Sequence, residues 1–248
     1  MSIDLREVRM PKQGLFRAGR WTDVDTFPAP AQAISPRLFS AGPPLNDGYP
    51  RWEDAFGRFS TAKFSATPMA AIGRTLADYR RYEEGGSGIL NIFKSFFTHG
   101  SEDDAEPVLV EAMIPESYFE DAHRLRLGYD SDLRFIDVEH QRTRNTLQEI
   151  LEGPLQALGV TIDEGLSQNR DRRVTRLVMS TLHDICLADE RRQVIGIRYR
   201  TPDPEWEAFV MWNPPSPAID LAGADISPIF PDDDDLMEAA GSLGLQIP

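Results

Sequence analysis

RWEDAFGRFSTAKFSATPMAAIGRTLADYR, residues 51–80, predicts a strand that runs directly into a helix. From Phe59 to Ala66 the two-residue period of a β-strand would place Thr61 and Lys63 on one face. Thr67 suits the N-cap of a following helix, and Pro68 suits its first turn. We therefore expect a strand at 59–66 and a helix from residue 68 to about residue 81.

Each of these two elements carries a basic residue, although the chain has a formal net charge of −14. Lys63 lies in the strand, where an edge lysine would guard against aggregation. Arg74 interrupts a helical stripe of small residues, Ala70, Gly73 and Ala77. Small residues allow a backbone or a ligand to approach closely. Arg74 therefore lies over a concave site, or is a surface arginine whose stem covers apolar groups.

The composition predicts a soluble, cytoplasmic protein. The 248 residues, of which 41% are hydrophobic, are enough for a substantial core. An acidic chain repels phosphate backbones and anionic lipids, so direct binding to nucleic acid or membrane is not expected. The single cysteine, Cys186, excludes an intrachain disulfide and fits a reducing compartment. The first residues lack an apolar segment of signal-peptide length, and no apolar run reaches the roughly 20 residues that span a bilayer.

The order of predicted elements indicates a single α+β domain with a mixed sheet. Residues 1–215 would form this domain, with an irregular proline-rich segment at 22–50. Residues 216–248 would be a weakly packed acidic tail, because Asp232–Asp235 form a charge run. Further strands are expected at 108–114, 133–138, 194–201 and 206–212, the last two as a hairpin, and further helices at 143–151 and 171–187.

No standard catalytic motif or metal site is present in the sequence. The four histidines and Cys186 lack metal-ligand spacing, so no metal is expected. Walker, GxGxxG and GxSxG motifs do not occur. His183 and Asp184 are adjacent on a predicted helix and are expected to point apart, with His183 a partly buried helix residue rather than a base.

Several segments, taken in order, resemble the RES domain family, which is named for an arginine, a glutamate and a serine. LFRAGRW at 15–21 resembles its opening strand, and RWEDAFGRF followed by PMAAIGRTLADYR resembles its first strand–helix pair. RFIDVEHQRT resembles its middle segment, and VIGIRYRTPD with EAFVMWN resembles its closing hairpin. The resemblance covers about residues 15–213. It implies a fold related to the ADP-ribosyltransferases.

RES toxins degrade NAD and are often paired with an antitoxin that carries a DNA-binding helix-turn-helix domain. The resemblance places Arg17 on the arginine of the opening strand and Arg51 on the signature arginine. It places Thr201 where the family has its serine. The chain departs from the family at two positions, because Lys63 stands at its tyrosine and Arg74 at its glutamate.

These departures bear directly on the family's chemistry. Cleavage of the nicotinamide–ribose bond builds positive charge on the sugar, which a carboxylate stabilises and a guanidinium opposes. At about 4 Å and an effective dielectric constant near 20, one charge reversal is worth several kcal/mol.

Three functions therefore remain open. The first is that of an NAD-cleaving enzyme of the toxin type, which uses Arg51 and Thr201 and takes its carboxylate from Glu83 or Glu84. Alternatively, the chain is a catalytically degenerate relative that binds NAD, another nucleotide or an anion through the basic residues Arg17, Arg51, Lys63 and Arg74. The third function is to act through a protein partner of the antitoxin type.

Overall fold

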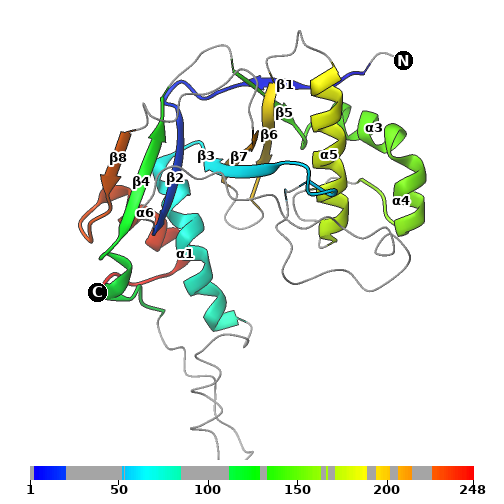
Figure 1. Ribbon diagram of the computed structural model, residues 1–248. Coiled ribbons are helices and arrows are strands. Elements are labelled where there is room, and N and C mark those ends of the chain that lie inside the picture. The colour runs from blue at the N-terminus through cyan, green and yellow to red at the C-terminus, as the bar shows by residue number, and fades with distance from the viewer. Residues whose placement is uncertain are drawn as a thin grey trace, which may run out of the picture. The chain divides into compact units, whose positions relative to one another are not determined.

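The computed structural model describes residues 3–20, 52, 54–84, 112–128, 133–162, 166, 171–188, 194–201, 206–213 and 225–248. Over these residues the protein belongs to the mixed α+β class, as the sequence predicted (Figure 1). Its contacts define two compact units. Unit 1 comprises Met1–Leu15, Asp23–Ala66 and Arg126–Asp225, and unit 2 comprises Phe16–Thr22, Thr67–Leu125 and Ile226–Pro248.

Unit 1 contains strands in the order β1-β5-β6-β7-β3. Their bounds are β1 Glu7–Arg9, β5 Arg134–Asp137, β6 Val194–Arg200, β7 Glu207–Asn213 and β3 Ser60–Ser65. β5 and β6 are parallel, and the other pairs are antiparallel. The predicted β6–β7 hairpin is confirmed. Gly196 is required in it, because a Cβ there would lie 1.9 Å from the Val210 carbonyl oxygen.

The parallel pair β5–β6 needs a crossover connection, and the described part of the sequence between these strands contains three helices. They are α3 (Gln141–Ile150), α4 (Glu152–Leu158) and α5 (Arg172–Ala188). The predicted helices at 143–151 and 171–187 are thus confirmed. The apolar stripe of α5, which includes Val174, Val178 and Leu182, is fully buried in the same core as Ile197 and Val210 of the sheet.

Unit 2 contains β2 (Leu15–Arg20), β4 (Ala122–Leu127) and β8 (Asp225–Pro228), adjacent in that order. Its helices are α1 (Pro68–Glu84), α6 (Asp234–Leu243) and the short 3-10 helix η2 (Glu116–Tyr118). α1 begins where the sequence predicted, with Thr67 Oγ1 accepting a hydrogen bond from the Ala70 N–H at 3.2 Å. Ile72 and Leu76 of α1 are fully buried.

The expectation of a weakly packed C-terminal tail is wrong for residues 225–248. Asp233 caps α6, its carboxylate accepting a hydrogen bond from the Asp235 N–H at 3.0 Å. The helix packs against α1 and buries Leu236, Ala239, Ala240 and Leu243. The aspartate run is therefore the start of a helix, where negative charge complements the helix dipole.

Two other segments predicted from the sequence lie wholly or partly outside the described residues. The irregular segment at 22–50 lies outside the described residues, as do 108–111 of the strand expected at 108–114. Within the described end of that strand, Met113 forms a single parallel bridge with Gln246. None of the helices in the described ranges is long and apolar enough to cross a membrane.

Candidate functional site

The strongest candidate ligand site lies in unit 2, where two arginines interact with each other. Arg17 is on β2 and Arg74 is near the middle of α1, and both side chains are half-buried. Burial lowers the pKa of Arg17 below its usual value, and the charge of Arg74 lowers it further. The two guanidinium groups therefore lie close enough to repel one another. Such a pair is suited to bind an anion with several oxygen atoms.

Arg74 sits on α1 as the sequence analysis described, among small residues. Ala70 and Gly73 are buried, and Ala77 is half-buried. Small side chains allow a neighbouring group to approach this stripe closely. Arg74 is a long, half-buried side chain among these small residues, and it is not a fully exposed surface arginine.

Lys63 and Thr201 belong to unit 1, and they are on the same face of the sheet but are not adjacent. Lys63 lies opposite Val210 of β7, which in turn lies opposite Ile197 of β6. Thr201 is four residues beyond Ile197, which corresponds to about 13 Å along the strand. The strand register thus separates these two members of the expected pocket.

Thr201, expected in the place of the family's serine, forms the end of the β6–β7 hairpin. Its Oγ1 accepts a hydrogen bond from the Trp206 N–H at 2.8 Å, and its own N–H donates to the Trp206 carbonyl at 2.9 Å. These contacts join the ends of β6 and β7, so the hydroxyl has a structural role.

Three further expected site residues lie wholly or partly outside the described residues. Arg51 lies outside the described residues. Glu83 and Glu84 end α1, and their side chains lie outside the described part as well. In the ranges that are described, no group of three His, Cys, Asp or Glu side chains is arranged to hold a metal ion.

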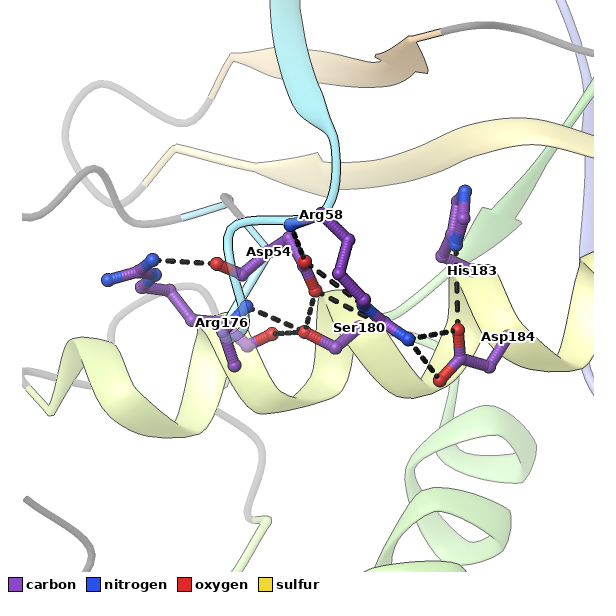
Figure 2. Close-up of polar contacts among 7 residues, drawn as sticks. Asp54, Arg58, Arg176, Ser180, His183 and Asp184 are labelled. Atoms are coloured by element: carbon purple, nitrogen blue, oxygen red, sulfur yellow. Dashed lines mark hydrogen bonds and ion pairs between the residues drawn. The ribbon is translucent and has the colours of Figure 1, made fainter. Parts of the chain in front are cut away.

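A polar cluster in unit 1, which the sequence analysis did not anticipate, surrounds Asp54. Figure 2 shows the Asp54 carboxylate between Arg58 and Ser180, on the segment before β3. Asp54 is fully buried. It accepts hydrogen bonds from Arg58 Nε and Nη2, each at 3.1 Å, and from the Ser180 hydroxyl at 2.6 Å. Burial alone would raise the pKa of Asp54, but these hydrogen bonds and the Arg58 charge hold it below its usual value.

Ser180 and Arg176 connect this segment to α5. The Ser180 Oγ accepts a hydrogen bond from the Ala55 N–H at 2.7 Å, and Arg176 Nη2 donates to the Asp54 carbonyl at 2.6 Å. Since Ser180 is bonded to a carboxylate and a backbone amide, and not to an imidazole, it has none of the features of an activated nucleophile. The cluster fastens the segment that follows Arg51 to the helix.

Arg58 extends the cluster to the surface. Its Nη1 lies 2.9 Å from Asp184 Oδ1, and both of these side chains are about half exposed. The pKa of Arg58 is raised, chiefly by its hydrogen bond to Asp54. Figure 2 shows the guanidinium between the two carboxylates, Asp54 on one side and Asp184 on the other. Opposite charges therefore neutralise each other along Asp54, Arg58 and Asp184.

His183 is packed among aromatic rings beside the cluster. It stacks on Phe59 with ring centroids 3.9 Å apart and meets Trp212 edge-on at 5.5 Å. The expectation that His183 and Asp184 point apart is wrong, since His183 Nδ1 lies 3.6 Å from Asp184 Oδ1. Burial lowers the pKa of His183 despite the opposing effect of Asp184. The imidazole is thus largely neutral and packed in the core. This agrees with the prediction that His183 is a partly buried helix residue rather than a base.

Two sequence signals pointed to the Asp54 cluster. Asp54 and Arg58 are four residues apart and opposite in charge, and Ser180 is a polar residue in the apolar run of α5. Both signals are common in solvent-exposed positions, so neither predicts burial by itself.

Comparison with known proteins gives no match to a protein-family model, to a curated protein or to a solved structure. The link to the RES family therefore rests on the sequence resemblance alone.

Proposed function

We propose that the protein binds NAD or a related nucleotide that contains a diphosphate, with the phosphates at Arg17 and Arg74. The observation that carries this proposal is that Arg17 on β2 and Arg74 on α1 are both half-buried in one unit and that the charge of Arg74 adds to the lowering of the Arg17 pKa by burial. An anion bound between two like charges relieves their mutual repulsion. A diphosphate supplies two negative charges and several acceptor oxygens, which suit the planar forks of arginine.

The overall charge of the chain makes this pair distinctive. With 40 Asp and Glu against 26 Lys and Arg, most of the surface repels a nucleotide. The two arginines carry the opposite sign to the average of the chain. General electrostatic attraction between the acidic chain and a nucleotide is therefore unfavourable. A nucleotide would bind only at a defined site such as the one proposed at Arg17 and Arg74.

The second candidate is cleavage of the nicotinamide–ribose bond of NAD. The resemblance from 15 to 213 supports it, and with it a RES-like fold related to the ADP-ribosyltransferases, a cytoplasmic location, toxin activity and an antitoxin partner. Arg74 opposes this chemistry, because it stands where the family has a carboxylate. Glu83 or Glu84 would then have to provide the negative charge beside the sugar. We rank this candidate second for that reason.

Calorimetric titration with NAD, ADP and pyrophosphate tests the binding proposal. Arg74→Glu should weaken binding of all three ligands at least about tenfold, which corresponds to roughly 1.4 kcal/mol. Arg142→Glu on α3 is the matched control, because it makes the same charge change at a side chain that is 57% exposed and paired with Asp4. Equal affinities for the wild type and Arg74→Glu, or no binding by the wild type, would overturn the proposal.

Release of nicotinamide from NAD, measured in the same samples, separates the two candidates. The binding proposal expects no release by the wild type. Release by the wild type that Arg74→Glu does not increase would favour the second candidate with a carboxylate from elsewhere. In that case Glu83→Gln and Glu84→Gln are the variants to compare.

A further inference from the structure

β8 and the turn that follows it present a row of apolar side chains to solvent. Alternation along the extended chain directs Ser227 and Ile229 inward. Ser227 accepts a hydrogen bond from Arg124 Nε at 3.1 Å, and Ile229 is fully buried. The intervening residues Ile226, Pro228 and Phe230 therefore point outward. We call these three residues the outward row.

The outward row is more exposed than large apolar residues normally are. Phe230 is 57% exposed and Ile226 is 40% exposed, and Met237 in the first turns of α6 is 47% exposed. Three of the seven exposed large hydrophobic residues in the described ranges thus fall within twelve positions. β8 is also the terminal strand in the strand order, where a partner can approach from the side. Concentration of apolar groups at a strand edge is typical of a docking surface.

The charge around the row determines what kind of partner fits. Residues 226–248 contain five acidic residues and no lysine or arginine. Arg124 pairs with Asp233 and Asp235, at 3.1 Å and 2.7 Å. Asp232, Asp234 and Glu238 are exposed. Burial raises the pKa of Asp235, and the charges of Asp233 and Glu238 add to this effect although Arg124 opposes it. The carboxylates at the start of α6 therefore still repel each other, and an incoming cation would relieve that repulsion.

We propose that the outward row and the exposed carboxylates of α6 bind a basic, amphipathic segment of another protein. Its apolar side chains would contact Ile226 and Phe230, and its lysines or arginines would lie near Asp232, Asp234 and Glu238. A second copy of this chain is a poorer partner, because a symmetric contact would bring the same carboxylates together. Anionic lipids and nucleic acids are repelled for the same reason.

The test uses a short synthetic peptide of alternating lysine and leucine, labelled for fluorescence anisotropy and titrated at physiological salt. Phe230→Ser and the double variant Asp232→Asn/Asp234→Asn should each weaken binding at least about tenfold. Leu187→Ser on α5 is the matched control, because Leu187 is also 57% exposed, and it should bind within about twofold of the wild type. A peptide with glutamate in place of lysine should not bind.

Three results would overturn the proposal. They are failure of the wild type to bind the lysine–leucine peptide, unchanged binding by Phe230→Ser, and an equal loss in Leu187→Ser and Phe230→Ser. Melting temperatures of all variants are recorded beforehand. Because the substituted side chains are exposed, they should lie near the wild-type value.

Discussion

Two groups of charged side chains in this protein are arranged in opposite ways. In unit 1, Asp54, Arg58 and Asp184 alternate in sign, and each charge has a partner at hydrogen-bonding distance. In unit 2, Arg17 and Arg74 bring two positive charges together. Opposite charges in contact hold a segment in place, whereas two like charges in one region are candidates for binding a ligand of opposite sign.

The pKa shifts of Asp54 and Arg17 show the same difference between the two groups. Hydrogen bonds overcome burial at Asp54, so its ionised form is favoured in the folded protein. At Arg17, burial and the neighbouring charge both disfavour the ionised form. Stability therefore explains the first group, and the proposed ligand site is based on the second.

The largest expected effect is on unit 1, through Asp54→Ala. This variant leaves Arg58 and the Ser180 hydroxyl without their buried partner, and it should cost about 3–5 kcal/mol of unfolding free energy. For a chain of this size the melting temperature should fall by roughly 6–20 °C. Asp184→Ala is the control, because it removes the half-exposed partner of the same arginine and should cost less than about 1 kcal/mol. If Asp54→Ala also lowers the unfolding free energy by less than about 1 kcal/mol, the Asp54 cluster is not structurally important.

The comparison also requires unit 2 to be firmly packed, which Leu236→Ala tests. Leu236 of α6 is fully buried, and its truncation should cost about 2–5 kcal/mol in denaturant unfolding. Met237→Ala removes a neighbouring side chain that is 47% exposed and should change stability by less than about 0.5 kcal/mol. If Leu236→Ala is as mild as Met237→Ala, α6 is loosely docked.

A smaller effect should appear in the pH dependence of stability. The folded pKa of His183 lies below 6.5, so the unfolded chain binds a proton more readily. Stability from the neutral, buried imidazole is therefore complete above pH 6.5 and declines as the pH falls from 6.5 towards the folded pKa. His183→Gln should flatten the unfolding free energy between about pH 7.5 and about pH 5.5.

The lowered pKa of Asp54 acts in a separate window. Its contribution is present above pH 3.8 and is lost as the pH falls further, through the folded pKa.

The His183 prediction has its own contradictory result. If the unfolding free energy of His183→Gln declines as steeply as that of the wild type above pH 5.5, other groups cause the acid sensitivity.

Elements with strong local signals were predictable from the sequence. Thr67 and Pro68 indicated the start of α1, and the two-residue period before and after the turn predicted at 202–205 indicated β6 and β7. α6 was missed because the aspartate run was interpreted as a solvated tail, although Leu236, Ala239, Ala240 and Leu243 have helical spacing. Asp54 was missed for a different reason. Burial of a carboxylate depends on partners from a helix more than 100 positions away in the sequence, and no local pattern contains them.

Of the candidate site, the sequence indicated that Arg74 was unusual, and the resemblance added Arg17. Their proximity depends on how β2 and α1 fold within unit 2, which the spacing of residues 17 and 74 does not reveal. The separation of Lys63 and Thr201 likewise follows from strand register, which the sequence alone did not provide.

The central claim is tested most directly by denaturant unfolding of the wild type and Arg74→Gln, each with and without NAD at about 100 times the wild-type Kd. The wild type should gain about 2.7 kcal/mol from the ligand, and a variant that binds tenfold more weakly should gain only about 1.4 kcal/mol. Without NAD, Arg74→Gln should be at least as stable as the wild type, because it removes the repulsion of Arg17. If Arg74→Gln is instead less stable without NAD and gains as much from NAD as the wild type, Arg74 is a structural residue and the nucleotide site lies elsewhere.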